Sequence, residues 1–322
     1  MKSDFKYKGR VEMNKDISIA FLLTAYEDAS NVNRFISQVL VYQKSHVFVH
    51  IDKKSRICKE DIIVNEKVHI MEKSYAVEWG DFSQIESVVA LMEYASTFGM
   101  FDYFSLHSES DMLVRPMGEL VEFLSDDHAY AYTWCYKLPY KEWQYGGGLG
   151  RIALYWPHIF RKKYRWNSPM RYFRSLYGKM FTLHLIKGKK LPKDIDFWGR
   201  CDWFTLSGAC VNFILDYLPK HPEYIELFRN SLIGSEIFFT TLVHMVKDKK
   251  IESLNNLRYI DFEHQDFQKP GSPKELDMND IEAIAASNRF FARKFNTRYD
   301  KNVIDYYLNI TGCEGQIMER NL

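Results

Sequence analysis

Two short apolar runs near the start of the chain flank one amphipathic stretch. Residues 17–25 (ISIAFLLTA) and 47–51 (VFVHI) are the apolar runs, and residues 31–42 lie between them. Runs of this length are typical of buried strands, and the spacing of the middle stretch is typical of a helix. The β-α-β pattern predicts an α/β fold with a mostly parallel central sheet flanked by helices, because parallel strands are covered on both faces. Ligands of such folds bind at the carboxyl ends of the strands.

The same alternation continues along the chain. We expect further strands at 68–71, 103–107, 130–136, 203–208 and 256–262, and helices at 83–97, at 210–218, from about 235, and at 279–291. Residues 265–280 contain two prolines and a glycine and predict a loop. No repeat interrupts the pattern, so one domain is expected over 1–322, with about residues 1–15 as an N-terminal extension.

The charge balance limits the range of partners. The formal net charge is +1 over 322 residues, whereas nucleic-acid binding usually requires a marked basic excess. Residues 143–193 nevertheless contain no Asp or Glu and about a dozen Lys and Arg. Such a run is either a solvated basic face or a contact surface for an anionic acceptor or a membrane. We therefore expect no nucleic-acid partner and keep a peripheral membrane contact as a hypothesis.

The cysteines and the first residues indicate a compartment. The five cysteines are scattered, odd in number and without metal-ligand spacing, which suits free thiols in a reducing compartment. The first sixteen residues carry charges where a signal peptide has its apolar core, and no apolar run reaches the roughly 18 residues of a membrane span. A cytoplasmic protein is expected, in contact with the inner membrane at most peripherally.

Acidic residues follow two of the expected strands. Asp52 comes directly after the second apolar run, where its carboxylate can accept hydrogen bonds from a ribose or a base, or can cap the next element. Glu109 and Asp111 follow the strand at 103–107, and two carboxylates spaced by one residue suit a Mg²⁺ or Mn²⁺ diphosphate site. Asp111 can equally orient a sugar hydroxyl or form a turn.

Aromatic residues accompany glycines and a carboxylate at two further places. Trp79 and Gly80 combine an aromatic face with room for a ligand at the backbone, although a core tryptophan is the more frequent case. In WGRCDWFTLSG, Asp202 stands next to Trp203, and a carboxylate beside aromatic rings suits a carbohydrate site. Removing a proton from a sugar hydroxyl needs a positioned base, and a carboxylate can serve.

Two cations near the end of the chain suit a diphosphate. Arg258 lies in the expected strand NNLRYIDF, and Lys294 lies in FFARKFN with Arg293 beside it. Together, Arg258 and Lys294 could neutralise a departing diphosphate, which is the electrostatic task that a metal ion performs elsewhere.

Taken in order, these segments resemble the successive motifs of one enzyme family. The segments are AFLLTAYE, VHIDKKS, VEWGDFS, FDYFSLHSESDMLVRP, CDWFTLSGACVNFIL, SEIFFTTL, LRYIDF and FFARKFN. They resemble the core-2/I-branching β-1,6-N-acetylglucosaminyltransferases and the related peptide O-xylosyltransferases over nearly the whole chain. The resemblance implies a GT-A fold, a UDP-sugar donor and no prosthetic group. It also implies direct displacement at the anomeric carbon, so that an α-linked donor gives a β-linked product.

The resemblance also implies roles for individual residues. Asp202 matches the position of a general base, Asp52 matches a nucleotide-binding aspartate, and Arg258 and Lys294 match two cations that bind the diphosphate. Glu236 matches the second acid of an Asp-Glu pair, which we place with Trp203 on the acceptor side.

From their own segments, Trp79, Gly80 and Asp111 are expected on the donor side. Ser235 stands where the family has the first acid of the Asp-Glu pair, and Glu109 adds a carboxylate that the family generally lacks.

The expected activity is transfer of a sugar, most often N-acetylglucosamine in this family, from UDP to a glycan or lipid-linked glycan. Animal members carry membrane anchors and disulfides, and neither is visible here, so a bacterial-type enzyme of surface polysaccharide synthesis is expected. The family implies that no metal is required. Two alternatives are a catalytically silent sugar- or nucleotide-binding protein on the same scaffold and a metal-dependent transferase that uses Glu109 and Asp111.

Overall fold

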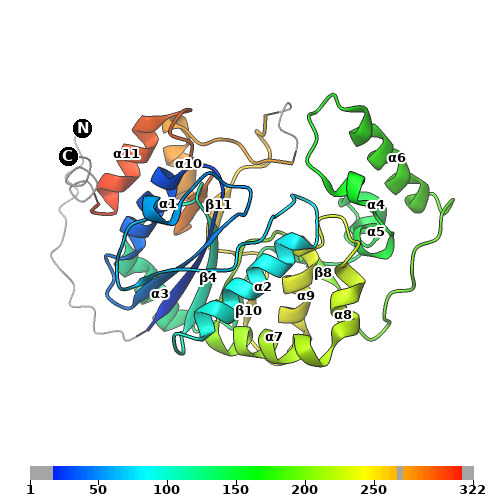
Figure 1. Cartoon of the computed structure of the whole chain (residues 1–322), viewed down its shortest axis with the longest axis horizontal. Helices are drawn as coiled ribbons and strands as arrows, with labels where there is room; N and C mark the ends of the chain where they lie inside the picture. The colour runs from blue at the N-terminus through cyan, green and yellow to red at the C-terminus, as the bar shows by residue number, and fades with distance from the viewer. Residues whose placement is uncertain (1–16, 267–270, 314–322) are drawn as a thin grey trace.

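A seven-stranded sheet forms the centre of the molecule (Figure 1). The computed structural model describes residues 17–266 and 271–313, so the expected extension at about 1–15 lies outside the described residues. In the order β10-β6-β9-β4-β1-β2-β3, strand β9 is antiparallel to β4 and β6, and the other neighbours are parallel. The strands are β1 Ile19–Ala25, β2 Ser45–Ile51, β3 Val68–Ile70, β4 Tyr103–Ser108, β6 Ala131–Tyr132, β9 Thr205–Ser207 and β10 Ile251–Glu252. The α/β fold with a mostly parallel sheet is confirmed.

Strand β1 shows why helices cover both faces of this sheet. Ile19, Phe21 and Leu23 belong to one apolar cluster, whereas Ala20 and Leu22 belong to another. All five side chains are fully buried, and successive residues of a strand point to opposite faces. The first cluster includes residues of α1 (Ala29–Val39) and α3 (Met117–Asp127), and the second includes residues of α2 (Ser83–Ser96), α7 (Gly208–Lys220) and α9 (Ser235–Met245).

Two smaller sheets and the remaining helices complete the described chain. One sheet has the order β11-β12-β5, and the other pairs β7 with β8. These strands are β5 Met112–Leu113, β7 Cys135–Lys137, β8 Trp198–Arg200, β11 Arg258–Ile260 and β12 Phe291–Arg293. The further helices are α4 Gln144–Gly147, α5 Gly150–Ala153, α6 Pro169–Thr182, α8 Pro222–Phe228, α10 Ile281–Ala286 and α11 Lys301–Ile310.

Two sequence predictions differ from the structure. The single strand expected at 130–136 is two strands in different sheets, because β6 pairs with β9 and β7 pairs with β8. The helix expected at 279–291 ends at Ala286. Asn288 adopts a left-handed conformation with φ 55°, which stops a helix, and Phe291 begins the buried strand β12.

The basic segment contains a helix, α6, that is not among the helices predicted from the sequence. Helix α6 lies at the periphery, on the side of the molecule opposite α11 (Figure 1). Arg174 attaches this helix to the preceding segment. It is buried and donates hydrogen bonds to the backbone carbonyls of Phe160 and Lys162 at 3.1 and 3.0 Å.

Candidate active site

A cavity of about 450 Å³ opens where β1, β2 and β4 end. Thr24 and Ala25 of β1, Asp52 directly after β2 and Ser108 at the end of β4 line it. This is the edge of the sheet at which the sequence predicts a ligand, because the carboxyl ends of parallel strands meet there. Residues from other parts of the chain close the cavity, and these parts are 77–88, Lys163, 200–203, 233–239, 260–262, 271–273 and 293–294.

Asp52 is held in place by the backbone around it. Its Oδ1 accepts a hydrogen bond from the Lys54 amide at 2.7 Å, and its Oδ2 accepts one from the Val77 amide at 3.2 Å. The carboxylate still lines the cavity. Asp52 therefore fits both roles suggested by the sequence, because it organises the following turn and also lines the cavity in which a ligand would bind.

Trp79 lines the cavity, but Gly80 does not. The Gly80 amide donates a hydrogen bond to the Arg161 carbonyl at 2.8 Å. A Cβ atom on Gly80 would lie 2.7 Å from that oxygen. The donor role predicted for Gly80 is therefore not supported by its position, because the close approach that requires a glycine is made by the backbone of the protein itself.

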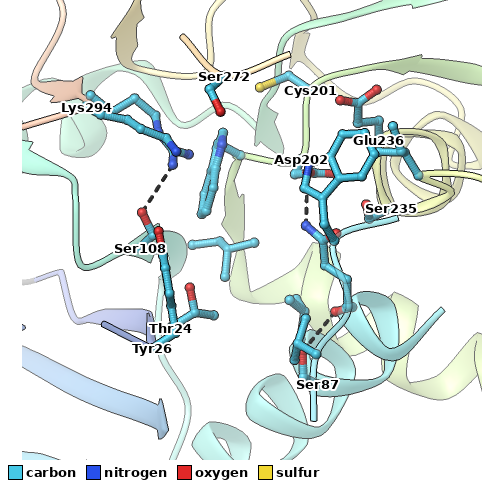
Figure 2. Close-up of a pocket in the computed structure, with 18 of the residues that line it drawn as sticks. Thr24, Tyr26, Ser87, Ser108, Cys201, Asp202, Ser235, Glu236, Ser272 and Lys294 are labelled. Atoms are coloured by element: carbon cyan, nitrogen blue, oxygen red, sulfur yellow. Dashed lines mark hydrogen bonds between the residues drawn. The ribbon is translucent and has the colours of Figure 1, made fainter. Parts of the chain in front are cut away.

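Asp202 and Glu236 lie on the same side of the cavity, opposite Lys294 (Figure 2). Asp202 follows β8, and its Oδ2 accepts a hydrogen bond from Gln84 at 3.1 Å. Its Oδ1 is inaccessible to solvent and has no hydrogen-bond partner among the described residues. Glu236 stands in the first turn of α9, forms an ion pair with Arg151 at 2.5 Å, and keeps 24% of its side chain exposed.

Burial raises the pKa of both carboxyl groups. Removal from water raises the pKa of Asp202 above its ordinary value, although nearby cations, Arg293 and Arg151, act in the opposite direction. The pKa of Glu236 is raised to about 7, by burial first and by the negative charge of Asp202 as well, while Arg151 opposes this. Two neighbouring carboxyl groups with raised pKa values are typical of a site that moves a proton near neutral pH.

Three cations from two segments gather on the other part of the cavity. These cations are Lys163, Arg293 and Lys294. Burial, followed by the positive charges of Arg293 and Lys163, lowers the pKa of Lys294 to about 8. The guanidinium of Arg293 lies 3.7 Å from the centre of the Trp203 ring, which also lines the cavity.

Lys294 and Trp203 are thus brought to the site as the sequence predicts. The sequence alone marks Arg293 only as a neighbour of Lys294 and Lys163 only as one cation of the basic run.

Arg258 lies outside the cavity lining, which corrects its assignment as a diphosphate ligand. Its guanidinium donates to the backbone carbonyls of Asn256, Leu106 and Phe204 at 2.5, 2.6 and 3.1 Å. These carbonyl groups hold the cation beneath the site. Arg293 therefore takes the position beside Lys294 that sequence analysis gave to Arg258.

Glu109 and Asp111 do not meet at the cavity either. Both carboxylate oxygens of Glu109 accept hydrogen bonds from the backbone amides of Tyr26 and Glu27, at 2.8 to 3.1 Å. Asp111 is buried and pairs with Arg293 at 3.3 Å and with His107 at 3.2 Å. Burial acts to raise the pKa of Asp111, but Arg293 and His107 lower it below the ordinary value. Neither carboxylate lines the cavity, so the predicted donor role of Asp111 and the metal-dependent alternative lose their geometric basis.

The residues that are described contain no cluster of three or more His, Cys, Asp or Glu side chains arranged to hold a metal ion. His50 and Gln84 line the cavity but were not predicted from the sequence, and neither was Arg151, which contacts the lining residue Glu236. Gln84 lies in α2 and contacts Asp202, and Arg151 lies in the basic run and contacts Glu236. Both contacts join residues that are far apart in the sequence, so they could not be predicted from it.

A helix-flanked, mostly parallel sheet with a polar cavity at its carboxyl edge is consistent with the GT-A-like fold of glycosyltransferases. The model of the Core-2/I-Branching enzyme family matches residues 19–285, and the chain belongs to this family. It is therefore a glycosyltransferase, which uses a nucleotide-sugar donor and a glycan acceptor. No curated protein matches the chain.

Proposed function

We propose that the protein is an inverting transferase that moves N-acetylglucosamine from UDP to a glycan hydroxyl and forms a β-linkage, without a metal ion. The observation that carries the proposal is one cavity in which Asp202 and Glu236 lie opposite Lys294 (Figure 2), with Lys163 and Arg293 also in its lining. Inversion needs a base for the acceptor and charge neutralisation for the leaving group, and the carboxylates and the cations match these needs. Surface polysaccharide synthesis in the cytoplasm is the setting that we propose, in one catalytic domain.

Glu236 is the general base in this proposal, in place of Asp202. Its pKa of about 7 lets it accept a proton near neutral pH. Arg151 fixes one carboxylate oxygen, and the side chain remains partly exposed to the cavity. Asp202 is less suited, because its Oδ1 is inaccessible to solvent and only its Oδ2, which already accepts one hydrogen bond from Gln84, is left to meet an acceptor. Asp202 then positions the acceptor and holds the pKa of Glu236 up by its charge.

The chemical step is a single displacement. The acceptor hydroxyl transfers its proton to Glu236 while its oxygen forms a bond with the anomeric carbon, and the bond from that carbon to the diphosphate oxygen breaks. UDP leaves with the electron pair. Lys294, Arg293 and Lys163 stabilise the negative charge that develops on the diphosphate, and Asp52 and Trp79 lie where they can contact the nucleoside.

The test compares two isosteric variants in a UDP-release assay with EDTA, using a panel of UDP-sugars with glycan acceptors. Glu236→Gln is expected to lower kcat by roughly 10²- to 10⁴-fold, because it removes the proton acceptor. Asp202→Asn is expected to cost less in kcat and to raise the KM for the acceptor. In the wild type, kcat/KM should fall as pH drops below about 7, because Glu236 becomes protonated.

Three results would oppose this proposal. A larger kcat loss in Asp202→Asn than in Glu236→Gln would return the base role to Asp202. Release of UDP only after addition of Mn²⁺ or Mg²⁺ would support a metal-dependent enzyme. Binding of UDP without release from any donor and acceptor would indicate a silent binding protein.

A further inference from the structure

Helix α6 carries an apolar stripe that the protein covers only in part. Phe173, Leu176, Tyr177 and Met180 recur at the spacing i, i+3, i+4 and i+7, which places them on one face of a helix. Phe173 is 59% exposed and Leu176 is 56% exposed. Together with Ile159, Phe160 and Met170, these residues form a shallow, open groove on the surface, which is called the α6 groove below.

The helix is fixed to the protein by its other face. Gly178 lies so close to the Tyr145 ring that a Cβ atom would be 2.1 Å from it, and Arg174 is buried against backbone carbonyl groups. The stripe is therefore held outward by the fold. The next residues extend the exposed apolar surface, since Leu183 and Leu185 are 67% and 68% exposed.

The segment that carries the α6 groove has charges of one sign. Residues 143–193 contain no Asp or Glu, and Lys162, Arg165 and Lys179 of this segment are exposed. A second copy of this chain would bring two basic surfaces together, which is unfavourable. An anionic partner with an apolar interior is complementary to both features, and a bilayer of anionic phospholipids has this composition.

We infer that the α6 groove binds the surface of an anionic bilayer, with α6 lying in the plane of the interface. The apolar stripe enters the boundary between headgroups and acyl chains, and the cations contact lipid phosphates. Trp166 and Tyr172, both exposed, are residue types that favour this depth. No helix in the described parts of the chain is long and apolar enough to span a membrane, and an in-plane helix does not need to be.

The same segment reaches the cavity. Lys163 lines the cavity only a few residues before α6 begins, and the Arg161 backbone accepts the Gly80 hydrogen bond at its edge. Attachment through α6 would therefore hold the cavity close to acceptors carried at a bilayer surface. This inference does not depend on the proposed donor or base, because binding is measured without turnover.

The experiment is co-sedimentation of the full chain with extruded vesicles of phosphatidylcholine, alone or mixed with phosphatidylglycerol. We expect binding to the mixed vesicles, weaker binding to phosphatidylcholine alone, and weaker binding in high salt, because the surface charges are screened. The double variant Phe173→Ser, Leu176→Ser should lower the partition coefficient for the mixed vesicles roughly tenfold or more.

A matched control separates the groove from general surface apolarity. Val64 and Met100 are 89% and 93% exposed elsewhere on the protein, and Val64→Ser, Met100→Ser should bind the vesicles like the wild type. Circular dichroism spectra and urea midpoints should be the same for all three proteins, which shows that they are folded without any assay of turnover.

Three results would overturn the inference. The first is equal binding of wild type and the Phe173→Ser, Leu176→Ser variant. The second is no binding to either type of vesicle at low salt. The third is a wild-type dimer in sedimentation velocity that the same substitutions dissociate, which would assign the groove to a second copy.

Discussion

Lys294 combines two effects that usually occur apart, burial of an ammonium group and proximity to other cations. Burial, Arg293 and Lys163 lower its pKa to about 8. Below this pH the side chain is charged, and above it the side chain is neutral. A diphosphate attracts only the charged form, so the interaction is lost as pH rises through the pKa.

We therefore predict that kcat/KM for the donor decreases above about pH 8 in the wild type. In Lys294→Arg the decrease should vanish, because a guanidinium remains charged over this range. Lys294→Met should give a low kcat/KM with no alkaline limb. Measurement of kcat/KM from pH 6 to about 10 tests this, and an unchanged alkaline limb in Lys294→Arg would exclude Lys294 as its source.

Single residues also mark the limit of what could be predicted. Asp52, Asp202 and Lys294 were found from sequence because each stands in a recognisable segment next to a predicted strand, and the structure brings all three to the cavity. Arg258 and Asp111 also stand at predicted strands, but their side chains enter a buried cluster with His107 and Arg293. The strand pattern gives the place of a residue along the chain, whereas its partners come from residues far away in sequence.

At the scale of elements, the junction of β9 and α7 depends on a glycine. Gly208 is the first residue of α7, and a Cβ atom there would lie 2.1 Å from the Phe101 carbonyl oxygen. This neighbour is backbone just before β4 and cannot move aside as a side chain can. Overpacking of this kind costs about 1–3 kcal/mol.

Gly208→Ala is therefore expected to lower the free energy of unfolding by about 1–3 kcal/mol, seen as a lower urea midpoint at constant slope. Ala209→Ser is the control, because the neighbouring position is exposed and surface substitutions are usually within about 0.5 kcal/mol. A midpoint equal to that of the wild type in Gly208→Ala would show that the backbone at Phe101 yields.

Elements were predictable where the apolar pattern is local and long. The β1-α1-β2 unit and α2 agree with the sequence within a few residues, because each has a clear period. The prediction for the segment after α10 was wrong. The apolar residues 290–292 continue a helical pattern in the sequence, and only pairing with β11 and β5 makes this segment a strand. Helix α6 was missed because its apolar stripe faces outward in an otherwise basic segment.

At the scale of the whole molecule, the cavity is assembled from both ends of the chain. Its lining runs from Thr24 to Lys294, and the central sheet, α2, α9 and the β11-β12 sheet all contribute to it. A ligand that contacts all these parts binds the folded state and not the unfolded chain. Its binding free energy is then added to the stability of the entire fold.

UDP is accordingly expected to raise the free energy of unfolding by about 2.7 kcal/mol at a concentration one hundred times its Kd. The shift should be equal with EDTA, because Lys163, Arg293 and Lys294 supply the positive charge that meets the diphosphate. Uridine, which lacks the diphosphate, should give a much smaller shift at the same concentration, and Lys294→Met should reduce the UDP shift toward the uridine value. Urea titration with each ligand measures this. A UDP shift that appears only with added Mn²⁺ would mean that the three cations do not suffice and that a metal ion joins the donor.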